Sequence, residues 1–155
     1  MQMLSQRTKY GLRALLALAK RQKREPILIA DLAKEERIPK KFLELILLQL
    51  KNKGILQSKK GKGGGYLLGK KAEVIHLGDV IRALDGPLAP LPCVSQMAHR
   101  KCDECEDEKT CGIRSVMQEV RDATANILDG TTLADVLRRT ELLEQERNRV
   151  LVYSI

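Results

Sequence analysis

A glycine- and lysine-rich stretch at residues 58–66, Ser-Lys-Lys-Gly-Lys-Gly-Gly-Gly-Tyr, constrains the fold of this chain more than any other segment. Short apolar runs flank it at 55–56 and 66–68, and each can form part of a strand. The glycines tolerate positive φ angles without steric cost, so the chain can reverse direction between the two runs. The stretch therefore predicts a β-hairpin with a flexible tip, where Lys59, Lys60 and Lys62 have no apolar neighbours.

Two helical segments come directly before this hairpin. Residues 30–36 make two helical turns, and Ile38-Pro39 then interrupts the pattern. The segment from Lys40 to Lys53 is helical, and Gly54 ends it. Its predicted apolar face consists of Phe42, Leu43, Ile46, Leu47 and Leu50. Two helices joined by a short turn predict a helix-turn-helix, and the basic hairpin after them predicts the winged form. An ordinary helical hairpin is the alternative.

The first helix is predicted from Ser5, a suitable N-cap, to about Lys20. Its apolar residues recur at helical spacing. A charged exit follows over residues 21–25 and is closed by Pro26. The apolar residues 27–29 are too few for a helix, which indicates a brief strand or a packed connection.

The composition favours a mainly α protein. The 155-residue chain has no Trp and one Phe, so Leu, Ile, Val and Ala must form its core. No apolar run approaches the roughly 18–20 residues that span a bilayer, and the start of the sequence lacks a signal-peptide pattern. We therefore expect a cytoplasmic protein.

Charge is distributed unevenly along the chain. Residues 1–71 carry 18 Lys and Arg against 5 Asp and Glu, whereas residues 72–155 carry 10 against 15. Only the first half is therefore suited to a polyanion. A membrane surface would need a Trp- and Phe-rich face opposite the lysines, and the predicted helices lack one. Double-stranded DNA is the better candidate, and no membrane is expected as a partner.

The second half predicts helices at 77–84 and 113–129, the latter expected to be the longest. Ile113, Val116, Val120 and Ile127 form an apolar stripe that one winged domain is too small to cover, so a second copy is expected to pack there. A capping box at 132–135 begins a further helix. The predicted parts are a winged domain at 1–86, a loop at 87–112, a dimerisation helix with the following helix at 113–140, and a tail at 141–155.

All four cysteines lie in the predicted loop, with the spacing Cys-x8-Cys-x2-Cys-x5-Cys from Cys93 to Cys111. In a reducing cytoplasm such a cluster indicates a metal centre rather than disulfides. Structural zinc usually uses two Cys-x2-Cys pairs, and only Cys102 and Cys105 make one here. A thioredoxin-like use of that pair is disfavoured, because the surrounding sequence lacks a βαβ pattern and nearby carboxylates oppose a reactive thiolate.

Several motifs together resemble a known family. They are LSQRTKYGLRA at 4–14, FLE at 42–44, KGKGGGYLLG at 60–69, the cysteine window, and TTLAD at 131–135. This set resembles the Rrf-two family of bacterial winged-helix regulators, which includes IscR-, NsrR- and CymR-like proteins, and in particular its iron–sulfur subgroup. The resemblance implies a homodimeric transcription factor that dimerises through the long helix after the cysteines.

The resemblance also implies a [2Fe–2S] or [4Fe–4S] cluster held by Cys93, Cys105 and Cys111. At the family's histidine ligand position this chain has Arg114, and at the position of an alternative aspartate ligand it has Lys9. Neither cation can ligate iron. The expected fourth ligand is therefore the extra thiol, Cys102, and the runner-up is the loop histidine, His99.

These observations predict a sequence-specific regulator whose DNA binding is modulated by the cluster. The helix from Lys40 would enter the major groove, with Lys40 and Lys41 on phosphates or base edges and Glu44 on a cytosine amino group. Two-fold symmetry would require a palindromic operator. One alternative is a regulator of the same fold that uses its cysteines for zinc, or for thiol or metabolite sensing without a cluster. Another is an iron–sulfur assembly or electron-transfer protein that does not bind DNA.

Overall fold

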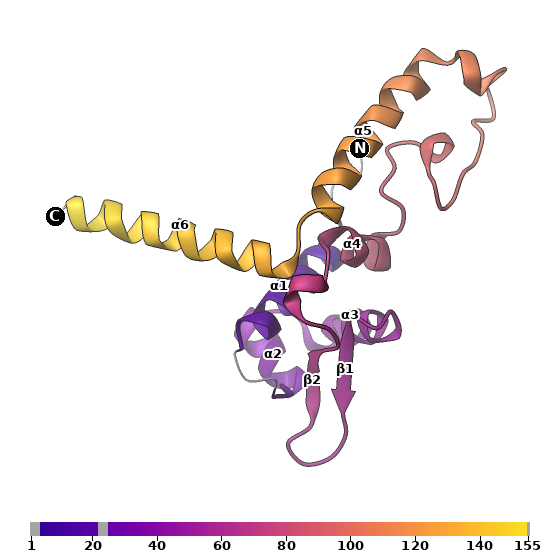
Figure 1. Ribbon diagram of the computed structural model, residues 1–155. Helices are drawn as coiled ribbons and strands as arrows, with labels where there is room; N and C mark the ends of the chain where they lie inside the picture. Colours follow the sequence, from indigo (N-terminus) through magenta and orange to yellow (C-terminus); the bar gives the residue numbers. More distant parts are fainter. Residues whose placement is uncertain (1–3, 22–24, 155) are drawn as a thin grey trace.

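The computed structural model describes residues 4–21 and 25–154, and it is mainly helical with one two-stranded sheet (Figure 1). The predicted helix-turn-helix and hairpin are both present. The charged exit predicted at 21–25 lies largely outside the described residues. The elements are α1 (Gln6–Lys20), α2 (Ile29–Glu36), α3 (Lys40–Asn52), β1 (Leu56–Lys59), β2 (Gly65–Leu68), α4 (Leu77–Asp85), α5 (Gly112–Asp129) and α6 (Leu133–Tyr153), with 3-10 turns η1 (Ala72–Val74), η2 (Pro92–Val94) and η3 (Glu108–Thr110).

Helix α1 begins as its sequence predicts and lies at the centre of the head, the part formed by α1 to α4 and the hairpin. The Ser5 hydroxyl accepts a hydrogen bond from the backbone N–H of Thr8 at 3.1 Å, which satisfies one of the free donors of the first turn. Gly11 allows α4 to approach closely, because a Cβ there would lie 2.4 Å from Leu84 Cδ1. The lack of a side chain at this position thus sets the α1–α4 distance.

The core lies between α1, α2, α3, α4 and the base of the hairpin, with Leu133 added from the start of α6. Phe42 is the exception to the predicted apolar face of α3, since 38% of its surface is exposed. It lies at the edge of the core and contacts Tyr10 edge to face, with 5.7 Å between ring centroids. The fully buried residues include Leu15, Leu32, Leu43, Ile46, Leu47, Leu50 and Val80.

The turn between α2 and α3 is tight. Arg37 adopts a left-handed conformation (φ 53°), and its N–H closes the end of α2 on the carbonyls of Ala33 and Lys34. Pro39 then precedes α3, where its fixed φ suits a helix start and its missing N–H is no loss. At the other end Gly54 (φ 74°) lies just past the C-cap, as the sequence predicts.

The hairpin depends on two of its glycines. A Cβ on Gly64 would lie 2.3 Å from the carbonyl oxygen of Lys59, and one on Gly65 (φ 140°) would lie 2.1 Å from that of Ile27. The bare glycines leave room for paired hydrogen bonds between Ile27 and Tyr66, at 2.9 and 2.8 Å. Of the apolar residues 27–29, Ile27 alone forms a bridge, and Ile29 already begins α2.

Helices α5 and α6 leave the head in different directions (Figure 1). Helix α6 has 21 residues against 18 in α5, so the expectation that α5 is the longest is wrong. The predicted capping box is present at Thr132 and Asp135. Beyond it α6 continues without interruption through Glu141 to Tyr153, so the tail predicted at 141–155 is helical over its described part.

Helices α4 and α5 are joined by a two-point ion pair. Arg82 donates from Nη1 and Nη2 to the two carboxylate oxygens of Asp129, at 2.7 and 2.9 Å. This hydrogen bonding lowers the pKa of Asp129 and raises the pKa of Arg82. The pair thus fixes the C-terminal end of α5 to the head.

We expect Asp129→Asn to lower the stability by about 1 kcal/mol at neutral pH, after allowance for solvent screening of this partly exposed pair. Because the folded protein lowers the pKa of Asp129, the carboxylate stabilises the fold above the ordinary carboxyl pKa of about 4. That contribution is lost as the pH falls through the lowered value. Urea unfolding should therefore show a difference between the two proteins that shrinks in acid. Asp79→Asn, at a looser 3.8 Å contact with Arg82, serves as the control and should have a smaller effect.

None of the helices in the described part of the chain combines the length and apolarity needed to cross a membrane.

Candidate nucleic-acid interface and cysteine site

The outward face of α3 is open to a partner. Lys40, Lys41 and Glu44 are all exposed, and among the described residues no side chain caps the N-terminus of this helix. Free backbone N–H groups and two ammonium groups in one helical turn suit a phosphate. Leu45 and Leu48 are also exposed on this face, although they are apolar. Neither leucine was predicted as a site residue, yet apolar side chains on a helix in the major groove can contact thymine methyl groups.

A hydrogen-bonded chain fixes the orientation of α3. Arg7 of α1 donates to the side-chain oxygen of Gln49, and Gln49 Nε2 donates to the carbonyl oxygen of Ala83 in α4 at 2.5 Å. Three helices are therefore connected through one glutamine. This arrangement holds the outward face of α3 at a set angle to the rest of the head.

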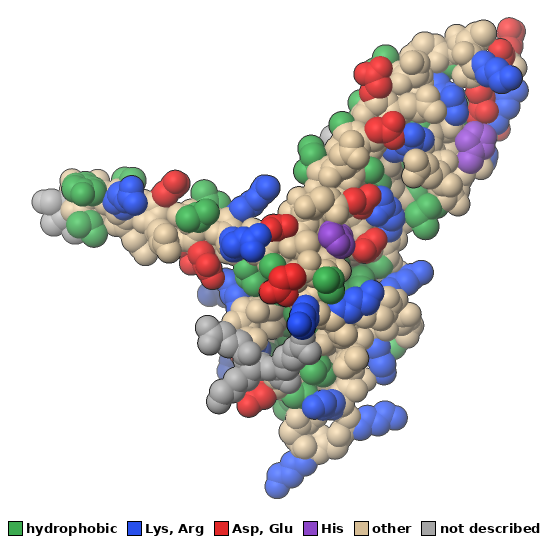
Figure 2. Space-filling model, in the orientation of Figure 1, with side chains coloured by type: hydrophobic (Ala, Val, Ile, Leu, Met, Phe, Trp, Pro, Cys, Tyr) green, Lys and Arg blue, Asp and Glu red, His purple; other side chains and the backbone are tan. Residues whose placement is uncertain are grey.

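The hairpin carries its positive charge at the tip. Lys59, Lys60 and Lys62 are exposed, and Figure 2 shows basic side chains projecting from this end of the molecule. The paired base, where Leu56 lies opposite Leu68, packs toward the core. The hairpin is therefore anchored at one end and presents cations at the other.

We expect the double change Lys60→Ala and Lys62→Ala to weaken DNA binding and to reduce its salt dependence, by roughly one unit of log–log slope for each phosphate that is no longer neutralised. The stability should not change, because these side chains are exposed. The matched control changes Lys70 and Lys71, at the other end of the hairpin, which removes the same charge. Gel shifts over a range of salt concentrations would measure both proteins. Equal slopes for the two would contradict a role for the tip.

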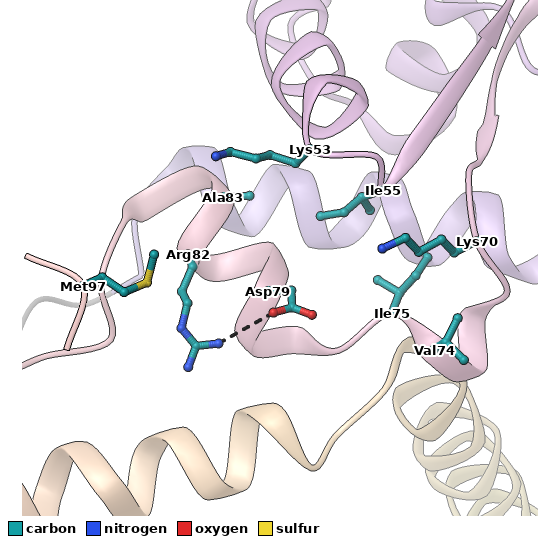
Figure 3. A pocket seen from close by; sticks show the side chains of 9 residues that line it. All are labelled: Lys53, Ile55, Lys70, Val74, Ile75, Asp79, Arg82, Ala83 and Met97. Atoms are coloured by element: carbon teal, nitrogen blue, oxygen red, sulfur yellow. Dashed lines mark ion pairs between the residues drawn. The ribbon is translucent and has the colours of Figure 1, made fainter. Parts of the chain in front are cut away.

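A hollow of about 270 Å³ lies between the base of the hairpin and α4 (Figure 3). Arg82 and Asp79 point into it, and Lys53 and Lys70 lie on its rim. The charged groups at its floor already pair with each other and with Asp129. The hollow therefore lies beside the Arg82–Asp129 ion pair that joins α4 to α5.

The apolar stripe on α5 is uncovered in the single chain. Ile113, Val116 and Ile127 are 68%, 55% and 66% exposed, and Val120 is half-buried. The distal half of α6 likewise exposes apolar side chains, among them Leu142, Leu143, Val150 and Leu151. So much apolar surface on two projecting helices is typical of a protein interaction surface.

The four cysteines lie in the loop that leads to α5, and all of them line one cavity of about 360 Å³. Cys93 is buried in η2, while Cys102 and Cys105 are more accessible. Cys111 is the N-cap of α5, where its sulfur accepts the N–H of Arg114 at 3.4 Å. Segments that are far apart in the loop thus bring their thiols to a common space.

His99 takes a different position. Its Nε2 contacts Glu108 Oε1 at 2.9 Å, its side chain is about half exposed, and it is not among the residues that line the cysteine cavity. The sequence placed His99 in the same loop as the cysteines. The structure separates its ring from their cavity.

Two arginines of α5 hold the beginning of the loop. Arg114 Nε donates to the carbonyl oxygen of Cys93 at 3.3 Å, and Arg121 Nη1 donates to that of Val94 at 2.6 Å. Arg114 was predicted only as a residue that cannot ligate iron, and Arg121 was not predicted as a site residue. The seven-residue spacing of the two arginines, which puts both on one helix face, was the available signal.

Burial raises the pKa of the Cys93 thiol, and a hydrogen bond shared with Cys102 raises it further. The charge of Arg114 acts in the opposite direction. Within the described part of the chain, no three side chains of His, Cys, Asp or Glu converge closely enough to hold a single metal ion. A cluster of several irons spaces its ligands more widely than one ion does, and four thiols around one cavity fit its preference for thiolates.

The sequence and the fold were compared with those of known proteins. The sequence pattern of Rrf2, described as an iron-dependent transcriptional regulator, matches residues 4–139. The chain belongs to the Rrf2 family. This confirms the resemblance to the Rrf-two family seen in the sequence motifs, and the chain is accordingly a helix-turn-helix, DNA-binding transcriptional regulator.

Individual Rrf2 proteins show how similar the chain is to its relatives. An rrf2-like helix-turn-helix regulator of Rhodobacter capsulatus is 41% identical over 138 residues, which cover 87% of this chain and 92% of the relative. The structure of CymR, the global cysteine regulator of Bacillus subtilis, has a TM-score of 0.73 and 31% identity, covering 90% of this chain and 98% of CymR. The structure of T. potens IscR has a TM-score of 0.70 and 25% identity, covering 90% and 88%.

Proposed function

We propose that this Rrf2-family regulator acts in the cytoplasm as a homodimer that binds a palindromic DNA operator, and that an iron–sulfur cluster held by its cysteines modulates this binding. One observation carries the proposal: Cys93, Cys102, Cys105 and Cys111 line a single cavity at the N-terminal end of α5. The basic α3 and hairpin tip lie on a separate part of the molecule (Figure 1). The chain thus has a candidate sensing site and a candidate DNA surface joined by one helix.

The exposed stripe on α5 supports the homodimer. Ile113, Val116, Val120 and Ile127 repeat at steps of three, four and seven residues, which is the spacing that two helices use to pack against each other. Pairing two copies through this stripe would present two α3 helices. A two-fold symmetric protein of this kind reads two inverted half-sites about one helical turn of DNA apart, roughly 34–36 Å.

The DNA contacts follow from exposure and charge. Lys40 and Lys41 would bind phosphates or base edges, and Glu44 would accept a hydrogen bond from a cytosine amino group. Lysines at the hairpin tip would follow the phosphate backbone or enter the minor groove.

The four thiols would hold the cluster, and Cys102 is the proposed fourth ligand because it lines the cavity that His99 does not. When bound, such a cluster supplies a one-electron redox centre that oxygen or nitric oxide can also attack. The chain's own contribution is positional: Cys111 is fixed at the helix start, and Arg114 and Arg121 hold the backbone carbonyl groups of Cys93 and Val94 at the beginning of the loop.

The test is to purify the protein without oxygen and to measure its absorption spectrum together with its iron, sulfide and zinc content. Gel shifts on operator DNA would then compare the loaded protein with protein stripped of iron. We expect iron and sulfide in equal amounts, visible absorption, and a change in DNA affinity on stripping. A protein with zinc, or without any metal, would contradict the cluster but not the DNA-binding role.

A second candidate is direct thiol sensing without a cluster. The observation that favours it is that Cys93 and Cys102 line the same cavity, so their thiols face a common space. Mild oxidation of metal-free protein would then form one internal disulfide and alter DNA binding. Mass spectrometry of the oxidised protein, compared with a Cys102→Ser variant, separates this candidate from the first.

A further inference from the structure

The cysteine cavity has an unusual set of charges. Besides the four thiols and three apolar or neutral side chains, it is lined by the carboxylates of Glu104, Glu106 and Asp107. Of the described residues that line it, Arg114 is the one cation. Its guanidinium is also held in place, because Nε donates a hydrogen bond to the carbonyl oxygen of Cys93 at 3.3 Å.

We propose that Arg114 is a positioning residue that offsets the negative charge of a four-thiolate cluster and thereby raises its reduction potential. This inference rests on the proposed function, since it concerns the regulation of the same site. It assigns to Arg114 a role as a fixed countercharge that ligates nothing.

The physical reason is electrostatic. Four thiolates give an iron–sulfur cluster a net negative charge, and uptake of one electron makes that charge more negative. A cation beside the cluster therefore stabilises the reduced state more than the oxidised state. Glu104 and its two acidic neighbours act in the opposite direction. Because Arg114 is tied to the backbone of a ligand residue, its charge stays beside the cavity instead of moving into solvent.

Arg121 provides a matched control. It lies on the same helix and makes the same kind of bond, from its guanidinium to the carbonyl oxygen of the residue after Cys93, at 2.6 Å. It does not line the cysteine cavity. A purely structural contribution from such a hydrogen bond should therefore be lost equally in Arg114→Gln and Arg121→Gln, whereas the effect of a charge beside the cluster should be lost only in the first.

The experiment is a redox titration of full-length protein purified without oxygen, with dithionite as the one-electron donor and mediator dyes. Iron and sulfide are measured in each variant. We expect Arg114→Gln to disfavour reduction at least tenfold, which for a one-electron couple is about 59 mV toward lower potential. Arg114→Lys should retain most of the wild-type potential, Arg121→Gln should match the wild type, and Glu104→Gln should shift the potential upward.

Each outcome distinguishes the inference from the proposed function. A wild-type protein without iron and sulfide overturns both the role of Arg114 and the proposed cluster, but not the DNA-binding role. A loaded wild type whose potential is unchanged in Arg114→Gln, or which shifts equally in Arg114→Gln and Arg121→Gln, overturns the role of Arg114 and leaves the cluster in place. If the Arg114→Gln protein does not bind a cluster, the reduction potentials of Arg114→Lys and Glu104→Gln are compared with the wild type instead. Shifts in these potentials other than those expected would also overturn the role of Arg114.

Discussion

A Val116→Asp protein is expected to be monomeric and to lose more than a hundredfold in affinity for operator DNA. In the single chain Val116 is 55% exposed, so the change leaves the core of the head untouched. In the proposed dimer the same position is covered by the partner. A carboxylate buried there without a partner would cost several kcal/mol, roughly 3–5, and every 1.4 kcal/mol is a factor of about ten in the association constant.

Analytical ultracentrifugation would measure the oligomeric state, and a gel shift would measure DNA binding. Asn126→Asp is the matched control, because it adds the same charge on an exposed part of α5 away from the stripe. The control should remain dimeric. A Val116→Asp protein that is folded and fully dimeric would place the interface elsewhere.

Replacing Cys105 with alanine is expected to abolish the cluster, with loss of visible absorption and of bound iron and sulfide. Cys105 lies between Cys102 and Cys111 in the loop and lines the cavity that they share. Cys93 and Cys111 should behave in the same way when replaced. Circular dichroism of the metal-free protein should match the wild type, because the loop contributes little to the core of the head.

The fourth ligand is distinguished by two milder changes. Cys102→Ser should give a cluster that assembles but is less stable to oxygen, because an alkoxide or water is a harder and weaker ligand for iron than a thiolate. His99→Ala should have little effect, since that ring pairs with Glu108 outside the cavity. The reverse pattern, a normal Cys102→Ser protein and a bleached His99→Ala protein, would make His99 the ligand.

The parts of the fold that the sequence predicts well are those with local signals. A serine before an apolar repeat caps α1, a glycine ends α3, and the glycine-rich stretch forms the hairpin turn. These features depend on the conformational preferences of single residues, which can be read from the residue type alone. The need for glycine at position 65 could not be predicted in full, because a side chain there would clash with the carbonyl oxygen of Ile27, a residue far away in the chain.

What the sequence could not predict depends on contacts between distant residues. The end of α6 was not predicted, because the residues over 141–149 are mostly charged and the leucines among them are not packed against the head. Phe42 looked like a core residue, but the core was already filled by its neighbours on α3. For the site, the sequence shows that the cysteines lie in one predicted loop. Only the structure shows that His99 does not line their cavity and that Arg114 does.

The ion pair between Arg82 and Asp129 allows α5 to act as a lever arm, since it holds the C-terminal end of the helix while the end at the cysteines can move. One end of this 18-residue helix is capped by Cys111, and the other is fixed to the head, about 27 Å away at 1.5 Å per residue. Over that length a tilt of about 5° moves the far end by roughly 2 Å, similar to the helix shifts at subunit interfaces of allosteric proteins. In a dimer, opposite tilts of two such levers would change the spacing of the two α3 helices. A signal at the cysteines would then alter which half-site spacing fits best, and so which operators the protein selects.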